Sequence, residues 1–332
     1  MTDEHAVVVE MRKVFGEYLT ELAEQDQRIV VLDNDSDATT ASEIFRKRFP
    51  DRFLQMGISE KNIFGTAAGL ATTGLIPFPT VFATMAVRCA LDQIAISISY
   101  ANLNVKIPGG YVGGSKAGAS HIPIEDIAVM RALPNMRVAD PADAEDLKAV
   151  MRAALDVEGP VYFRVSKLAH PRIFEPGHDF AWGQGATLAS GTDVTLFGTG
   201  MMTALCLTAG QYLAADGISA EVVHLASIKP LDVSRVVESA ARTGAAIVAE
   251  NASIVGGLGA AVAETLCEHK PTPMYRIGYR DAWIHSGAIG DIVKRHRMTA
   301  IDIAAAAKQI LAQKDLVAHG GSGPTPLVID HD

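Results

Sequence analysis

Short runs of valine and isoleucine alternate with alanine-rich stretches of helical spacing along almost the whole chain. In the first half, these apolar runs occur at residues 28–33, 79–82, 104–107, 136–139 and 159–164. Strands buried on both faces are apolar throughout, so such runs between helices are typical of a parallel sheet covered by helices. The pattern predicts an α/β fold that begins with a helix over residues 8–25.

The periodicity stops between residues 168 and 190, where clusters of Pro, Gly and His indicate a connection across the surface. A second alternation then begins, with strands expected at 193–200, 220–225, 245–250 and 274–278 and a last helix at 301–313. We therefore predict two consecutive parallel-sheet α/β domains. The domains are residues 1–170 and 191–316, with a linker over 171–190 and a mobile tail over 317–332 that is rich in Gly, Ser and Pro.

Composition argues against several classes of function. The chain has 332 residues and a formal charge of -9, whereas a nucleic-acid surface needs clustered Lys and Arg. Cys89, Cys206 and Cys267 are far apart, as expected of reduced thiols. No apolar run reaches the roughly 18 residues that a membrane span needs, and the first residues do not resemble a signal peptide. We expect a cytoplasmic protein without a membrane or nucleic-acid partner.

One carboxylate stands at the start of a helix that is made largely of small residues. Glu60 follows a strand-like apolar run at 53–58 and precedes the small residues of 65–69. A helix N-terminus carries partial positive charge, which steadies an anion there. Glu60 is therefore either a group that handles a proton or one that only complements the helix dipole.

The segment 57–71 (GISEKNIFGTAAGLA) resembles the GIxEQNxxGxAAGLA signature of thiamine-diphosphate enzymes of the transketolase family. Other segments resemble the family in the same order and spacing, at 81–88, 92–94, 100–107, 118–121, 130–136, 228–232 and 256–259. The resemblance extends over roughly residues 10 to 315. It implies a thiamine-diphosphate pyrimidine-binding domain followed by a transketolase C-terminal domain, with thiamine diphosphate and Mg²⁺ as cofactors.

The resemblance also assigns residues to the cofactor. Glu60 matches the Glu that hydrogen-bonds N1′ of the aminopyrimidine ring. Phe82, Met85 and Arg88 match the side chains that enclose this ring, although Phe82 and Met85 also have the spacing of ordinary core residues. Asp35 matches an acid near the thiazolium ring, and it equally fits a solvated loop.

Four further residues match substrate contacts of the family. His121 matches an active-site His that contacts the hydroxyls of the donor sugar, so His121 and Glu60 are the candidate catalytic residues. Thr39 matches a hydroxyl that contacts the substrate phosphate. Arg12 and Lys167 match cations that bind the acceptor's phosphate, with ordinary surface cations as the alternative.

Two positions depart from the family. Ala117 stands where sugar-phosphate transketolases carry an Asp that reads a substrate hydroxyl, and Gly109 where some carry a phosphate-binding His. Because the missing carboxylate cannot accept that hydrogen bond, the ordinary pentose phosphates are in doubt as substrates. In the second domain, the glycines at 198–200 and 256–259 fit backbone turns, and the resemblance implies dimer contacts rather than catalysis there.

The chain contains no GDG sequence, which in this family holds Mg²⁺ and the diphosphate on a separate domain. The resemblance thus implies the C-terminal (β) subunit of a split transketolase, active only with an N-terminal subunit in an α2β2 assembly. Such an enzyme moves a two-carbon ketol unit from a ketose, phosphorylated or otherwise anionic, to an aldehyde. The alternatives are a subunit that uses a 2-oxoacid donor, as in 2-oxoacid dehydrogenases and deoxyxylulose synthases, and a non-catalytic paralogue.

Overall fold

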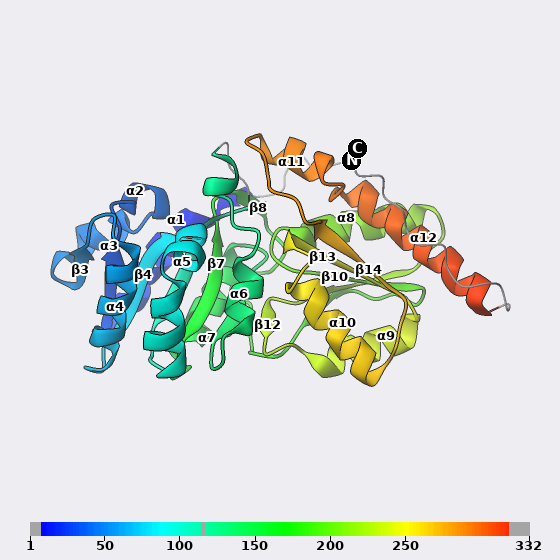
Figure 1. The fold of residues 1–332 in the computed structure, drawn as a ribbon. Coiled ribbons are helices and arrows are strands. Elements are labelled where there is room, and N and C mark those ends of the chain that lie inside the picture. Colours follow the sequence, from blue (N-terminus) through cyan, green and yellow to red (C-terminus); the bar gives the residue numbers. More distant parts are fainter. Residues whose placement is uncertain (1–7, 114–116, 319–332) are drawn as a thin grey trace.

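Two helix-covered sheets follow one another along the chain, as Figure 1 shows. The structure, a computed structural model, describes residues 8–113 and 117–318. Residues 319–332 of the predicted tail lie outside the described residues, whereas 317 and 318 belong to the last helix. In the described part of the chain, no helix has both the length and the apolar character needed to cross a membrane.

The first half of the chain contains β1 to β8. Its strands are β1 (Val8–Glu10), β2 (Ile29–Asp33), β3 (Phe53–Gln55), β4 (Ile76–Phe82), β5 (Lys106–Val112), β6 (Arg137–Ala139), β7 (Val161–Ser166) and β8 (Ala169–Pro171). Its α-helices are α1 (Met11–Gln25), α2 (Asp37–Thr40), α3 (Glu43–Arg48), α4 (Glu60–Ala71), α5 (Ala83–Cys89), α6 (Asp126–Ala132) and α7 (Ala144–Leu155). Three shorter or irregular helices are η1 (Pro50–Arg52), the π-helix η2 (Gln93–Tyr100) and η3 (Gly118–Ser120).

The second half contains β9 to β14. Its strands are β9 (Ala186–Ala189), β10 (Val194–Gly198), β11 (Ala220–His224), β12 (Ser227–Lys229), β13 (Ala246–Ser253) and β14 (Met274–Tyr279). Its helices are α8 (Met202–Ala215), α9 (Val233–Thr243), α10 (Leu258–His269), α11 (Ile289–Arg295) and α12 (Ala300–Ala318).

The strands form two large, mainly parallel sheets. The first has the order β12-β6-β7-β5-β4-β2-β3 and the second β14-β13-β10-β11-β9, while β1 and β8 form an antiparallel ribbon. The predicted α/β fold class is confirmed, with antiparallel strands β12 and β9 at one edge of each sheet. β12 comes from the second half of the chain but pairs with β6 of the first half, so the two domains share a sheet edge.

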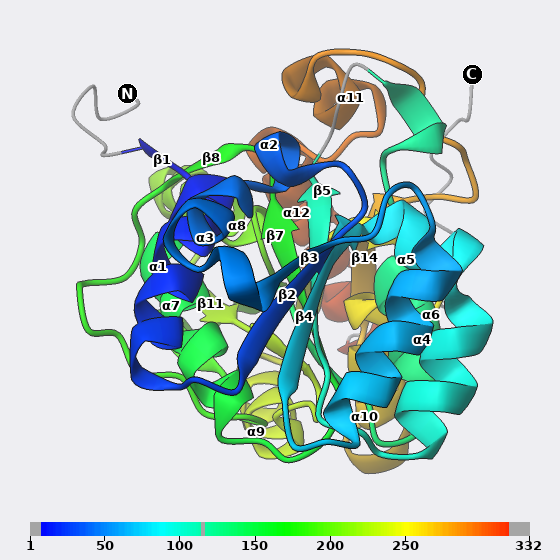
Figure 2. The same ribbon diagram turned by 90° about the vertical axis from the view of Figure 1, so that its left-hand side faces the viewer.

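Apolar periodicity explains how the first sheet is covered. Every residue of β2 is buried, as expected of a strand with helices on both sides. α1 buries residues at helical spacing, including Met11, Phe15 and Leu19, and packs with α7 on one face. Figure 2 shows α4, α5 and α6 on the opposite face, so both surfaces of the sheet are enclosed.

The structure differs from the sequence prediction at three element boundaries. The helix expected over 8–25 begins at Met11, because residues 8–10 pair with β8 as β1. The last four residues before 190, within the predicted linker, form β9 alongside β11. The last helix extends beyond the predicted 301–313. Short edge strands carry little apolar periodicity of their own, since one of their sides faces solvent.

Candidate active site

The carboxyl ends of four neighbouring parallel strands meet at one edge of the first sheet. β2, β4, β5 and β7 run parallel and end at Asp33, Phe82, Val112 and Ser166. In open α/β sheets, ligands bind in the loops beyond this edge. The strand ends, loops and helices next to this edge carry the predicted site residues, which are Arg12, Asp35, Thr39, Glu60, Phe82, Met85, Arg88, His121 and Lys167.

Glu60 is the first residue of α4, where the sequence predicted it. Its half-buried carboxylate accepts a hydrogen bond of 3.4 Å from Nδ2 of Asn34, which is the first residue after β2. Ser59 precedes the helix, but its hydroxyl donates to the Met56 carbonyl and does not cap α4. The N–H groups of the first helical turn are therefore left without a side-chain cap. An ionised carboxylate here has lone pairs for a further donor.

Three rings, from the ends of β4 and β5 and from the loop after η3, pack together at the same edge. The ring centroids of Phe82 and Tyr111 are 4.6 Å apart, and those of Phe82 and His121 are 5.7 Å apart. Tyr111 and His121 meet edge to face at 5.9 Å. The Nδ1 atom of His121 lies 2.9 Å from the Ser120 hydroxyl, so two rings and one hydroxyl fix the orientation of the imidazole.

Lys167 is held against the same cluster. Its ammonium donates a 2.6 Å hydrogen bond to the Tyr111 hydroxyl and lies 4.0 Å from the centroid of the Tyr111 ring. An ammonium over an aromatic face is attracted by the ring quadrupole. The partly buried cation is thus fixed against the ring that also contacts His121, which the sequence alone did not indicate.

Arg12 and Thr39 contact each other next to the segment of Lys167. Nη1 of Arg12 donates to the Thr39 carbonyl at 3.5 Å, and Nη2 lies 3.5 Å from the Glu10 carboxylate. A backbone hydrogen bond from Met11 to Leu168 joins the segment of Arg12 to that of Lys167. The chain therefore brings together the segments of the two predicted anion-binding cations, although they are 155 positions apart in the sequence (167 minus 12).

Arg88 makes contacts that place it beside the His121 segment. Its guanidinium forms two hydrogen bonds with Glu125, donates to the Ala119 carbonyl at 2.6 Å and lies 5.0 Å from the Trp283 ring. Met85 is half-buried one turn earlier on α5. Arg88 thus ties α5 to the loop that carries His121 and to the second domain.

The second domain also packs directly on the loop of His121. The Ser253 amide donates to the Ile124 carbonyl at 2.7 Å. A Cβ atom added to Gly118, whose φ is +70°, would lie 2.8 Å from the Ser286 hydroxyl. The loop before α6 is therefore shaped from both domains, and Gly118 is required by its left-handed backbone as well as by this contact.

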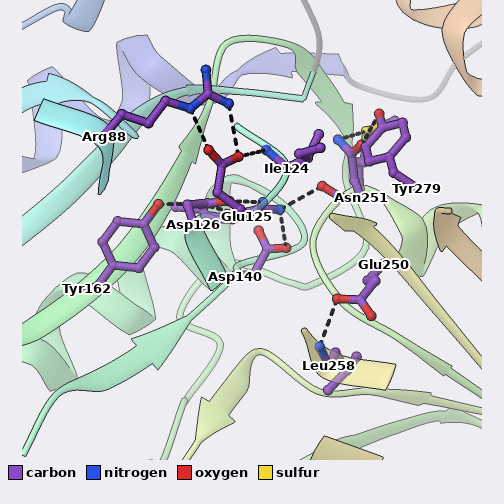
Figure 3. A network of polar contacts seen from close by, with 12 residues as sticks. Arg88, Ile124, Glu125, Asp126, Asp140, Tyr162, Glu250, Asn251, Leu258 and Tyr279 are labelled. Atoms are coloured by element: carbon purple, nitrogen blue, oxygen red, sulfur yellow. Dashed lines mark hydrogen bonds and ion pairs between the residues drawn. The ribbon is translucent and has the colours of Figure 1, made fainter. Parts of the chain in front are cut away.

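A buried polar network lies below this loop, as Figure 3 shows. The Arg164 guanidinium donates to both oxygens of Asp126, at 2.5 and 2.8 Å, and to Asp140 at 3.3 Å. It also donates to the Asn251 carbonyl of the second domain at 3.0 Å, and the Tyr162 hydroxyl donates to Asp126. Charged groups with almost no exposure need such partners, so this network fixes how the two domains meet.

Burial and charge shift the titration of the acids in this region in different directions. Burial alone would raise the pKa of Asp126, but the charge and hydrogen bonds of Arg164 outweigh burial and lower it. Burial raises the pKa of Asp140 to about 6, and Arg164 opposes this shift. Burial also raises the pKa of Glu250 to about 7, against hydrogen bonds from the Gly259 and Leu258 amides.

The structure thus brings Phe82, His121 and Lys167 together through Tyr111, which the sequence interpretation did not select. It places Asp35 in an exposed turn with a φ of 66°, while its neighbour Asn34 contacts Glu60. A tyrosine after two glycines at a strand end was the available signal for Tyr111. No sequence pattern indicated Asn34, because its contact with Glu60 depends on how β2 and β3 lie side by side.

Comparison with known proteins agrees with this arrangement. Residues 8–172 match the transketolase pyrimidine-binding domain, and residues 183–303 match the transketolase C-terminal domain. The 6-deoxy-6-sulfo-D-fructose transketolase subunit SqwH of Clostridium sp. (strain MSTE9) is 39% identical over 92% of this chain and 95% of its own. The chain belongs to the transketolase family.

Two other members of the transketolase family are similar along most of their length. An apulose-4-phosphate transketolase subunit of Phocaeicola vulgatus is 37% identical over 82% of this chain and 88% of its own. The structure titled split gene transketolase, inactive beta4 tetramer, has a TM-score of 0.87 and 44% identity, covering 92% of this chain and 99% of that one. The predicted assignment as a transketolase acting as one subunit of a split enzyme is confirmed, and it implies a partner subunit and a multimer.

The transketolase family uses thiamine diphosphate, and the site fits one part of that cofactor. The Glu60 carboxylate at the start of α4 can accept a hydrogen bond from a pyrimidine nitrogen, and Phe82 and Met85 offer half-buried apolar surface for a ring. In residues 8–113 and 117–318, no group of three or more His, Cys, Asp or Glu side chains could hold a metal ion. Glu60, Phe82 and Met85 are thus the described residues that fit the pyrimidine ring of the cofactor.

Proposed function

We propose that this subunit completes a thiamine-diphosphate transketolase that transfers a two-carbon ketol unit from an anionic ketose to an aldehyde. The observation that carries the proposal is the meeting of a carboxylate, an aromatic cluster with a histidine, and fixed cations at one edge of the sheet. A proton acceptor, a hydroxyl-binding group and an anion-binding group are the three functions that this transfer needs from the protein.

Each residue has a distinct role in the proposal. Bound thiamine diphosphate would supply the carbon nucleophile. Glu60 would hold a proton at N1′ of the pyrimidine ring, with Phe82, Met85 and Arg88 beside the ring and Asp35 nearer the thiazolium. Arg88 would act mainly through its bonds to Glu125 and the Ala119 carbonyl, which position the loop of His121.

The substrate side follows from the cations and the imidazole. His121 would bind hydroxyls next to the reacting carbonyl, since its ring is held by Phe82 and Tyr111. Lys167, Arg12 and Thr39 would bind a terminal anion on the sugar. The names of two relatives, a sulfofructose transketolase subunit and an apulose-phosphate transketolase subunit, support a sulfonate or phosphate at that end.

We propose that an N-terminal subunit supplies the Mg²⁺ ligands and the diphosphate site, in an α2β2 assembly. The surface formed by α4, which begins at Glu60, and by the adjacent η2 supports this partner. Gly65 on α4 has no atom within 4 Å of an added Cβ, and the adjacent η2 exposes Ile96 and Tyr100, which are 61% and 81% accessible. Apolar side chains on such a face are typical of a protein interface. The cytoplasmic location stays a prediction.

Ketol transfer by the co-expressed pair tests the proposal. Activity with hydroxypyruvate but not with pyruvate as donor is expected, and the opposite preference would favour the 2-oxoacid alternative. Tyr100→Glu should weaken assembly, measured by sedimentation, because it places a charge in the proposed interface. Tyr212→Glu on α8 is the matched control, since Tyr212 is exposed on the second domain. Ketol transfer by this chain without a partner would contradict the shared site.

A further inference from the structure

Tyr111 is held in an unfavourable backbone conformation at the end of β5. Its φ is 68°, in the left-handed region that non-glycine residues rarely adopt. The register between β5 and β7 shifts between Gly109 and Val112, so the strand is irregular where Tyr111 stands. Irregularities of this kind re-aim a side chain beside active sites, and such strain persists only where surrounding contacts hold it.

Residues of the proposed site contact Tyr111 from three directions in the chain, through Phe82, His121 and Lys167. One ring contact is with Phe82 at the end of β4, and another is with His121. The Tyr111 hydroxyl accepts the 2.6 Å hydrogen bond from Lys167, whose ammonium also lies over the Tyr111 ring. Tyr111, the aromatic residue of β5, therefore joins the imidazole of His121 to the ammonium of Lys167.

A side chain at position 109 of the same strand could not make these contacts with His121 and Lys167. A Cβ atom at Gly109 would lie 2.3 Å from the hydroxyl of Tyr162, which is fully buried and donates to Asp126. A histidine at 109, as some relatives of this family carry, would therefore displace the buried network. In this chain, the side chain that β5 delivers to the site comes from Tyr111, two residues further on.

We propose that Tyr111 is a positioning residue that presents the Lys167 ammonium to the terminal anion of the substrate. This inference rests on the proposed function, because it assigns the recognition of that anion. A lysine side chain has many rotamers, and fixing it before binding removes an ordering cost from the affinity for the anion. The ammonium keeps two further N–H donors for a phosphate or sulfonate oxygen after donating to Tyr111.

Tyr111→Phe in the assembled enzyme tests the proposal, because it removes the hydroxyl and keeps the ring. The KM for glyceraldehyde 3-phosphate should rise about 3- to 10-fold, with kcat and the KM for uncharged glyceraldehyde changed by less than about twofold. In a Lys167→Met background, Tyr111→Phe should add no further effect, because it acts through that lysine. An equal rise in KM for both acceptors would overturn the proposal.

Tyr18→Phe is the matched control. The Tyr18 hydroxyl accepts a 3.0 Å hydrogen bond from Arg152, whose guanidinium also lies 5.9 Å from the Tyr18 ring. The same atom is thus removed from a tyrosine–cation pair on α1, and both KM values should stay unchanged.

Anion binding to the full chain is a second measurement, which does not depend on turnover. Inorganic phosphate and methanesulfonate are titrated separately, and the ε-methylene NMR signal of Lys167 is followed. Tyr111→Phe should raise the dissociation constant of the anion that binds about 3- to 10-fold, and the stronger of the two anions identifies the terminal group. Binding by wild type that Tyr111→Phe leaves unchanged, or binding of neither anion, would overturn the inference. Absent ketol transfer with intact, Tyr111-dependent anion binding would instead contradict the proposed function.

Discussion

Replacing Arg164 by Met removes the cation at the centre of the buried network between the domains. Arg164 and Asp126 are 1% and 0% exposed, and Arg164 also serves Asp140 and the Asn251 carbonyl. Removing one partner of a buried ion pair costs about 3 to 5 kcal/mol, because the other charge stays buried without compensation. The loss is a large share of the roughly 5 to 15 kcal/mol that stabilises a folded protein.

The cost of Arg164→Met should depend on pH in a defined direction. In wild type, Arg164 keeps the pKa of Asp126 below its ordinary value despite burial. Without Arg164, burial is opposed only by the smaller effects of the hydrogen bonds from the Tyr162 hydroxyl and the Ile127 amide, so that pKa should rise above its unfolded-state value. Asp126 then takes up a proton as the pH falls, so the loss is fully present at about pH 8 and smaller at about pH 5.

Urea unfolding followed by tryptophan fluorescence measures this loss at both pH values. Arg48→Met is the control, because Arg48 pairs with Glu24 on the surface, where the two side chains are 60% and 50% exposed. Such a pair contributes at most about 1 kcal/mol. A stability of Arg164→Met within about 1 kcal/mol of wild type at both pH values would refute the role assigned to the network.

Two other predictions concern the same region. Because folding raises the pKa of Glu250 from 4.5 to about 7, the folded state holds an extra proton between these values, and stability should fall by about 3 kcal/mol as the pH rises from 4.5 to 7. Glu250→Gln should remove this contribution from the slope in urea titrations and leave that of Asp140, whose pKa is also raised, and parallel profiles for the two proteins would count against it. Gly109→Ala should cost about 1 to 3 kcal/mol by overpacking against Tyr162, whereas an unchanged unfolding midpoint would show that the strand can move aside.

Sequence periodicity was sufficient to predict the main strands and helices of the fold and the place of Glu60 in the site. The buried run at 28–33 and the small residues after Glu60 predicted β2 and the start of α4, because both signals are local. β12 could not be predicted as an edge of the first sheet, since three residues from the second half pair there with β6. Edge pairing between distant segments depends on tertiary contacts rather than on local pattern.

The family resemblance located most of the candidate site but not its internal contacts. It selected His121 and Lys167 without the ring that joins them, because Tyr111 reaches them only through a backbone irregularity. It selected Arg88 for the cofactor, whereas the contacts to Glu125 and Trp283 emerge from two packed domains. Pairings of this kind are set by three-dimensional packing, which single-sequence patterns do not encode.

Ketol transfer by the assembled complex carrying Glu60→Gln tests the shared active site most directly. The amide keeps the size of the side chain but cannot hold the proton that the carboxylate exchanges, so turnover should fall by at least about 100-fold. Assembly, measured by sedimentation, should be unchanged. Lys61→Met, at the exposed next position of α4, is the control and should keep full activity. Turnover of Glu60→Gln within about tenfold of wild type would contradict the role of Glu60 in the proposed transketolase reaction.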